Sequence, residues 1–239
     1  MAISLYVVSA ICGNFHKEST VNPAIYEGLH ELTPAQMTDN SVYGGYGLGQ
    51  WTSGTFSWGT LTRRANLINW LNANGYSWDD GNGQLEFLIQ ENYWHKNYGS
   101  YNSLAEFLNS SDDNINELTK CYFRCWEGIN NGTLSERQVW ANKFYDYIYA
   151  HYDDPSITTW VTGNRYLSEA QQMNNAVLVA RYLMDGAPSP TPPPTPPPIP
   201  PPTPPTPPYP PTPPWRPTED DLASIILMLL KRRKKRRFY

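Results

Sequence analysis

Cys12-Gly-Asn-Phe-His-Lys-Glu18-Ser-Thr-Val-Asn-Pro23 carries more structural information than any other part of this 239-residue chain. The residues before it are apolar on nearly all faces, which predicts a central, buried helix over residues 3–17. Glu18 then stands at the polar end of that helix. Further along, Gly44-Gly-Tyr-Gly-Leu-Gly-Gln-Trp51 is a glycine-broken aromatic segment typical of a hairpin that lines a groove. Together the two segments predict a carboxylate that faces an aromatic groove.

Proline divides the chain into three parts. Of the 23 prolines, 20 lie within residues 188–217, and such runs adopt the polyproline II conformation rather than helix or sheet. We therefore predict one globular domain over residues 1–187, a stiff polyproline II linker over 188–217 and a short tail over 218–239. A ligand for an SH3-type domain is an alternative for the linker, although the run is longer than such recognition needs.

Charge is distributed unevenly along the chain. Residues 1–187 contain ten Lys and Arg against 19 Asp and Glu, a formal charge near −9, whereas residues 218–239 carry about +4. A domain this acidic is not expected to bind nucleic acid. In the tail, Leu222–Leu230 predicts a short apolar helix and Lys231–Arg237 is wholly basic. This pattern fits an anchor on an anionic membrane, a docking peptide for a protein partner or a solubilising tail.

The chain gives no sequence signal for a membrane span, a metal or a cofactor. No segment reaches the ~18 apolar residues that a spanning helix needs, and we interpret Ala2–Cys12 as a core helix rather than a signal peptide because no basic segment precedes it. Three cysteines are too few for a disulfide framework, and we expect buried thiols. A link from Cys12 to Cys121 or Cys125 is the alternative if the protein works outside a cell.

The remaining pattern is mostly helical. Pro23 and Pro34 predict a loop over residues 20–40, and the Gly-, Tyr- and Trp-rich residues 41–60 predict strands and turns. Apolar periodicity and capping signals predict helices along Leu61–Leu71, Leu85–Tyr93, Leu104–Leu108, from Asp112 or Asp113 to Ile129, Thr133–Ile148 and Ser168–Gly186. The predicted fold class is α+β, mostly α, with a small β-hairpin region.

Glu18 is the candidate catalytic residue. Cleavage of a glycosidic bond needs a proton donor at the leaving oxygen, and a carboxylic acid serves at neutral pH when burial favours its protonated form. A second carboxylate could stabilise the oxocarbenium ion or hold a water. Asp39 is the best candidate for that role by position, and Glu27 and Glu31 are weaker ones. A mechanism in which the acetamido group of the substrate is the nucleophile needs no second carboxylate.

The order Glu-Ser-x-x-Asn-Pro, then Gly-Leu-Gly-Gln-Trp, resembles the two-part signature of the lysozyme and lytic-transglycosylase superfamily. Ala10–Pro23 is similar to the catalytic-helix motif of the phage tail lysozymes, which are virion-borne peptidoglycan hydrolases. Tyr46–Thr52 is similar to their groove motif, and Phe123–Glu127 and Arg137–Tyr145 resemble their later helices. The resemblance covers about residues 1–152 and implies a lysozyme-like fold.

By this resemblance Glu18 would be the general acid, and Ser19, Tyr46, Gln50 and Trp51 would bind the substrate. The substrate would be bacterial peptidoglycan, cut at its MurNAc–GlcNAc β-1,4 bond by a hydrolase or a lytic transglycosylase without metal or cofactor. The protein would be virion-associated or extracellular, and its tail would contact other virion proteins or an anionic membrane. The alternative is a non-catalytic cell-wall-binding or structural tail component that retains the fold.

One departure from that family concerns the order of helices. A helix resembling Tyr166–Gly186 usually stands before the catalytic helix in the family, whereas here it follows the domain. We interpret this order as a circular permutation in which residues 166–186 pack beside residues 3–17. The vestige of a lost second copy is the alternative.

Overall fold

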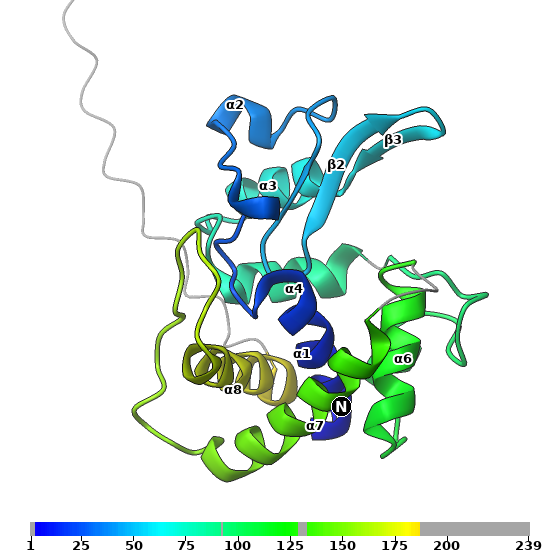
Figure 1. Ribbon diagram of the computed structural model, residues 1–239, viewed down its shortest axis with the longest axis vertical. Coiled ribbons are helices and arrows are strands. Elements are labelled where there is room, and N and C mark those ends of the chain that lie inside the picture. The colour runs from blue at the N-terminus through cyan, green and yellow to red at the C-terminus, as the bar shows by residue number, and fades with distance from the viewer. Residues whose placement is uncertain (1–2, 92, 129–132, 187–239) are drawn as a thin grey trace, which may run out of the picture. The chain divides into compact units, whose positions relative to one another are not determined.

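The computed structural model describes residues 3–186, except residue 92 and residues 129–132. The predicted linker and tail, residues 188–217 and 218–239, lie outside the described residues, and the domain boundaries remain predictions. The described residues form eight α-helices and one three-stranded sheet (Figure 1). This architecture confirms the predicted fold class. None of the described helices is long and apolar enough to span a membrane.

The elements follow one another in a helix–sheet–helix order. They are α1 (Leu5–Ser19), a 3-10 turn (Glu27–Leu29), α2 (Pro34–Met37), β1 (Gly44–Tyr46), β2 (Trp51–Phe56), β3 (Gly59–Thr62), α3 (Arg63–Ala73), α4 (Gly81–Glu91), α5 (Leu104–Leu108), α6 (Ile115–Cys125), α7 (Leu134–His151) and α8 (Glu169–Asp185). The sheet is antiparallel in the order β1-β2-β3. Together with α2 and α3 it forms the upper part of the molecule in Figure 1.

Helix α1 is the centre of the helical part. It contacts α6, α7 and α8 (Figure 1), and the unbroken run of residues from 7 to 15 is buried. A helix that is covered on several sides must be apolar on several faces, which is why its sequence shows no single apolar stripe. The packing of α1 therefore fixes where its last turn, with Glu18, is held.

The contact between α1 and α7 is unusually close at Gly13. A Cβ atom added there would lie 2.5 Å from the carbonyl oxygen of Arg137 and 2.7 Å from the Cβ of Ala141. Only glycine lets the two backbones approach this closely. The approach brings the side chain of Arg137 beside α1, one turn before Glu18.

The turn that follows Glu18 has a strained backbone. Thr20 and Val21 both have a positive φ, 53° and 54°, in the left-handed region that β-branched residues avoid. Such positions persist only where the surroundings enforce them. Asn175 of α8 does so, because its side-chain amide donates to the carbonyls of Val21 (2.9 Å) and Val161 (2.8 Å).

The segment before α8 is fastened to the same turn. The buried amide of Asn22 donates to the carbonyls of Gly163 and Arg165, at 2.7 Å each, and the amide nitrogen of Leu167 donates to Thr20 Oγ1 at 3.0 Å. The chain after α7 thus closes over the end of α1, and α8 packs against α1.

Several predicted details differ from the structure. Pro34 does not continue a loop but occupies the first turn of α2, behind a capping box formed by Thr33 and Gln36; proline is favoured there because its missing N–H is not needed. Helix α6 is capped by Asn114 rather than Asp112 or Asp113.

The two capping-box signals had different outcomes. Ser168 and Gln171 form the predicted box at the start of α8. Thr133 makes no side-chain cap bond at the start of α7, and Glu136 instead pairs with Lys17 of α1 at 2.8 Å. The three thiols are free and buried, as expected, and the Sγ atoms of Cys121 and Cys125 lie 3.9 Å apart.

Candidate active site

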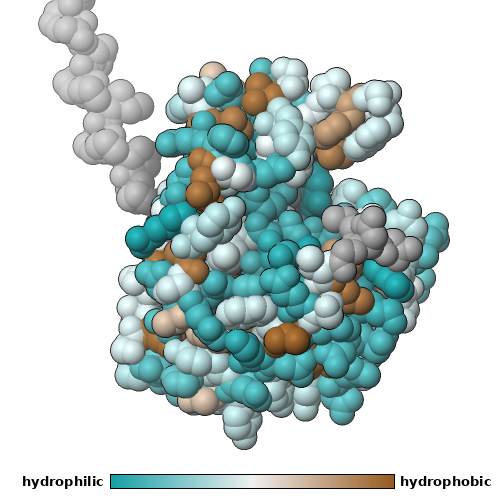
Figure 2. Space-filling model, viewed as in Figure 1, coloured by the Kyte–Doolittle hydropathy of each residue, from teal (hydrophilic) through white to brown (hydrophobic). Residues whose placement is uncertain are grey.

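A pocket of about 300 Å³ opens between the sheet and the end of α1. Its lining residues come from many parts of the chain: Glu18, Ile25, Tyr26, Glu27, Gly28, Gly49, Gln50, Thr52, Leu61, Arg63, Tyr93, Glu127 and Tyr166. Hydrophilic side chains spread across the middle of the face shown in Figure 2, below the sheet. The pocket therefore combines three carboxylates, one guanidinium and three tyrosine rings, a lining suited to a polar ligand with apolar faces.

Glu18 reaches this pocket from the last turn of α1. Its side chain is 20% exposed and forms an ion pair with Nη2 of Arg137. The left-handed residues that follow end the helix at once, so the carboxylate stands at the helix end and is not covered by a further turn.

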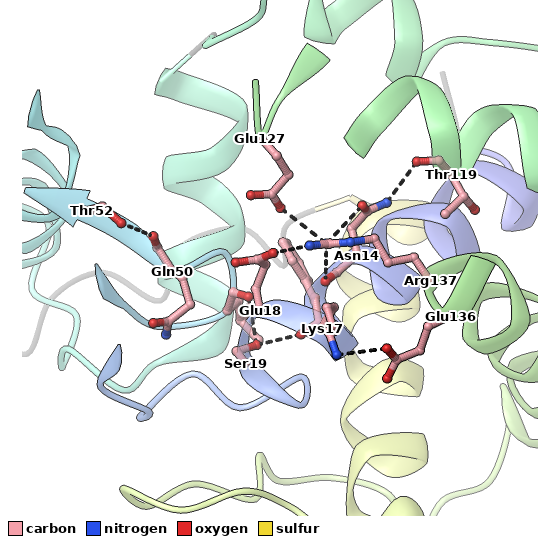
Figure 3. A network of polar contacts seen from close by, with 12 residues as sticks. Asn14, Lys17, Glu18, Ser19, Gln50, Thr52, Thr119, Glu127, Glu136 and Arg137 are labelled. Carbon is pink, nitrogen blue, oxygen red and sulfur yellow. Dashed lines mark hydrogen bonds and ion pairs between the residues drawn. The ribbon is translucent and has the colours of Figure 1, made fainter. Parts of the chain in front are cut away.

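Residues of α1 and α6 hold the side chain of Arg137 in place. Its side chain is only 4% exposed, and Nη1 donates to the backbone oxygen (3.1 Å) and side-chain oxygen (3.2 Å) of Asn14. Its guanidinium carbon lies 4.5 Å from the ring centre of Phe123. Asn14 is fixed in turn by donating to the carbonyls of Ala10 and Thr119. The cation beside Glu18 is therefore rigidly positioned (Figure 3).

Glu127, just beyond the end of α6, is a second carboxylate at the same guanidinium. Its Oε1 lies 3.8 Å from Nη1 of Arg137, its side chain is 8% exposed, and Oε1 has no hydrogen-bond donor among the described residues. Burial raises the pKa of Glu127 well above its usual range, and the negative charge of Glu18 raises it further, against the opposing effect of Arg137 and Arg63. Figure 3 shows Glu18 and Glu127 converging on Arg137.

Arg63 also lines the pocket. It makes two hydrogen bonds to Glu91, at 2.7 and 2.9 Å, and its guanidinium lies over the rings of Tyr93 (4.1 Å) and Trp126 (4.4 Å). The bidentate pair with Glu91 balances the positive charge of Arg63. Arg63 therefore does not act as an unpaired cation in the pocket.

Of the sequence-predicted site residues, Glu18 and Gln50 line the pocket. Gln50 has a positive φ of 47°, and its side-chain amide donates to the carbonyls of Ile25 (3.2 Å) and Gly47 (3.1 Å). Gln50 therefore stabilises the shape of the glycine-rich loop, and it also lines the pocket.

The other three predicted binding residues are buried and do not line the pocket. Ser19 donates to the carbonyls of Phe15 (3.0 Å) and Leu48 (2.7 Å), which ties α1 to the glycine-rich loop. Trp51 has no exposed surface and donates from Nε1 to Glu91 at 3.0 Å, and Tyr46 is 3% exposed. A side chain without exposed surface cannot stack on a sugar ring, so these positions favour a role in shaping the pocket.

Of the three carboxylates proposed to assist Glu18, which are Asp39, Glu27 and Glu31, Glu27 lines the pocket. Asp39 is exposed and accepts from the backbone and side chain of Ser41, which lowers its pKa; neither Asp39 nor Glu31 lines the pocket. Glu27 does line it, but its carboxylate accepts from the Tyr43 hydroxyl (2.5 Å), and this bond raises the pKa of Tyr43 to about 12.

Glu127, Arg137 and Arg63 were not predicted as site residues. The signal available was the resemblance of the segments around Glu127 and Arg137 to late helices of a known family, which gives no role to either side chain. Their convergence depends on packing between residues far apart in sequence; the Glu18–Arg137 pair alone spans 119 positions.

A mostly helical domain with a small sheet, and a carboxylate at the end of its central helix beside a polar pocket, is the arrangement of lysozyme-like proteins. The profile of the phage tail lysozyme family matches residues 3–148. The chain therefore belongs to the phage tail lysozyme family.

A curated relative is the protein named Morphogenesis protein 1 of Bacillus phage B103. It is 28% identical over 142 residues, which is 57% of this chain and 34% of that protein. The chain thus corresponds to about a third of the length of this relative. The match supports a phage context. The rest of the relative's length lies outside the match.

Proposed function

We propose that this protein cleaves the MurNAc–GlcNAc β-1,4 bond of bacterial peptidoglycan, with Glu18 as the general acid. The observation that carries the proposal is the position of Glu18, partly exposed at the wall of a polar pocket and held by a buried arginine. Membership of the phage tail lysozyme family supports the same substrate class. No metal or cofactor is part of the proposed reaction.

The chemistry requires a proton at the leaving oxygen and stabilisation of a sugar cation. Glu18 is the more exposed of the two carboxyls that meet at Arg137 and is the one that can approach the glycosidic oxygen. Either a water or the acetamido group of the substrate would attack the anomeric carbon. In the second case Glu18 acts as both acid and base, and the product is a 1,6-anhydro sugar.

The proposal is tested by Glu18→Gln, which keeps the shape of the side chain and removes the transferable proton. We expect lysis of purified cell walls to fall by at least about a hundredfold, the usual contribution of a general acid. Glu169→Gln is the matched control, because Glu169 forms an exposed pair with Lys143 away from the pocket and such pairs contribute little. Full activity in the Glu18→Gln variant would refute the mechanism.

The expected setting is the phage particle or the lysing host cell. The family and the relative both carry phage names, and this supports a role at the cell wall during infection. The predicted tail, residues 218–239, would supply contacts to other virion proteins or to an anionic membrane.

A second candidate is a non-catalytic structural component of the tail. The name of the relative, a morphogenesis protein, favours it. A structural protein would bind cell walls without cutting them, and its binding would not change in the Glu18→Gln variant. Lysis by the wild-type protein alone separates the two candidates.

A further inference from the structure

Glu18 faces a chemical difficulty if it is a general acid. A general acid must carry its proton when the substrate arrives, yet Glu18 is ion-paired with Arg137, and a neighbouring cation favours the ionised carboxylate. The pocket must therefore contain a feature that keeps a proton available at neutral pH.

The charges around the pocket supply that feature. Arg63 is compensated by its bidentate pair with Glu91, although it still lowers the pKa of Glu127. Among the described residues, Arg137 is the cation that pairs with both carboxyls, Glu18 and Glu127, and it does not itself line the pocket. If both were ionised, one negative charge would be buried without a counter-charge, and none of the described residues donates a hydrogen bond to Glu127 Oε1. Two carboxyls in such a site cannot both ionise easily.

We propose that Glu18 and Glu127 share a single proton across Arg137, and that this shared proton is the one Glu18 delivers to the glycosidic oxygen. The inference rests on the proposed function and adds Glu127 as a positioning residue that acts through Glu18. Both carboxyls pair with the same guanidinium, Glu18 at Nη2 and Glu127 at 3.8 Å from Nη1 (Figure 3).

The step balances. In the form of the pair that reacts, the shared proton is on Glu18 and Glu127 is ionised. The O–H bond of Glu18 breaks as an O–H bond forms on the leaving oxygen, and the electron pair of the breaking C–O bond stays with that oxygen. Glu18 and Glu127 then carry two negative charges while positive charge develops on the sugar ring. They stabilise the sugar cation most at this stage. The attacking water, or the sugar 6-hydroxyl in a transglycosylase, returns the proton to Glu18.

The groups that face Glu127 agree with this assignment. Glu18 comes from α1, Arg137 from α7, Arg63 from α3 and Tyr122 from α6. Burial raises the pKa of Tyr122 well above its usual range, so its phenol stays neutral. Burial and the charge of Glu18 raise the pKa of Glu127, which matches a pair of carboxyls that keeps one proton between them at neutral pH.

The first test is the pH dependence of kcat/KM on soluble peptidoglycan chains for the full-length wild type and Glu127→Gln. Glu127→Gln removes the second carboxyl that makes the pair retain one proton, so the alkaline limb of the profile should move down by one pH unit or more. Activity at pH 8 then falls about tenfold or more, while activity near pH 5 changes little. Glu169→Gln should follow the wild-type profile.

Two kinetic results would overturn the inference. In one, Glu127→Gln keeps the wild-type profile. In the other, it loses the same factor at every pH, which is the behaviour of a residue that only supports the fold.

A second measurement does not depend on activity. Carbon-13 NMR of glutamate-labelled protein should show one protonated side-chain carboxyl at pH 7 in the wild type and none in Glu127→Gln. In Glu18→Gln, where the shared charge is gone, this signal should titrate at lower pH than in the wild type. An unchanged titration would show that Glu127 is neutral by burial alone and would refute sharing. A wild type that cuts nothing would refute the proposed function, and the NMR titration would still decide the inference.

Discussion

At the scale of single residues, the site depends on which atoms are allowed to come close. Arg137 can reach Glu18, Glu127 and Asn14 together because Gly13 lets α7 approach α1. The catalytic proposal for Glu18 therefore rests partly on a residue that has no functional group. The same reasoning makes Gly13 a sensitive position for both stability and activity.

We predict that Gly13→Ala destabilises the protein. Alanine favours helix over glycine by about 1 kcal/mol, but the new Cβ would lie 2.5 Å from a backbone oxygen of Arg137. Rigid overpacking of this kind costs about 1–3 kcal/mol or more, and the clash with backbone outweighs the gain in helix propensity. Urea unfolding measures the difference, and wall lysis should fall as Arg137 moves.

Asn69→Ala on α3 is the control for that substitution, because Asn69 is an exposed helical residue and should change stability by no more than about 0.5 kcal/mol. A Gly13→Ala protein as stable as the wild type would contradict the close packing of α1 against α7 at this position.

At the scale of elements, α8 and the segment before it hold the turn that follows Glu18 in place, and we call them the brace. The amides of Asn22 and Asn175 connect this segment to the strained residues after Glu18, and Tyr166 from the same segment lines the pocket. This part of the chain lies beyond the matched residues 3–148. The brace is therefore an addition to the matched region that contributes to both the fold and the site.

We predict that a chain ending at residue 155 does not fold normally. It loses α8, whose buried side chains include Val177, Val179 and Leu183, and each buried aliphatic side chain contributes about 1.5–3 kcal/mol. Their sum reaches the whole stability of a typical domain, about 5–15 kcal/mol. Dye binding and near-ultraviolet circular dichroism report the loss of packing.

A chain ending at residue 186 is the control and should unfold cooperatively with the wild-type midpoint. A stable, soluble protein ending at residue 155 would contradict the role of α8 and with it the interpretation of the chain order as a permutation.

The elements were predictable where local chemistry decides them. Periodic apolar residues located the helices, and Ser168 with Gln171 formed the expected capping box. Thr133 and Glu136 have the same spacing, yet Glu136 found a tertiary partner in Lys17 instead. A local signal fails where a competing contact from another element offers the same side chain a better partner.

The site was predictable only in part, for a related reason. The spacing of Glu18 and Gln50 within recognisable motifs located one carboxylate and one pocket residue. The motif does not show which aromatic side chains face the core. Trp51 was expected to contact a sugar, but it is buried and donates a hydrogen bond to Glu91. Glu127 and Arg137 meet Glu18 only after α6 and α7 have packed on α1.

At the scale of the whole molecule, the pocket is assembled from distant parts of one chain. The end of α1, the glycine-rich loop, the end of α6 and the segment before α8 each contribute lining residues. Such a site exists only in the folded domain. The motif around Glu18 is recognisable in the sequence, whereas the grouping of Glu18, Glu127 and Arg137 is visible only in the structure. The predicted linker and basic tail would place this domain relative to a surface.

Mass spectrometry of peptidoglycan digested by the full-length protein tests the central claim most directly. We predict fragments cut at the MurNAc–GlcNAc bond, ending in a reducing sugar for a hydrolase or a 1,6-anhydro sugar for a transglycosylase. We also predict that the Glu18→Gln protein releases no such fragments and that Glu169→Gln releases them as the wild type does. Intact glycan strands after wild-type digestion, or the same fragments from Glu18→Gln, would contradict the account.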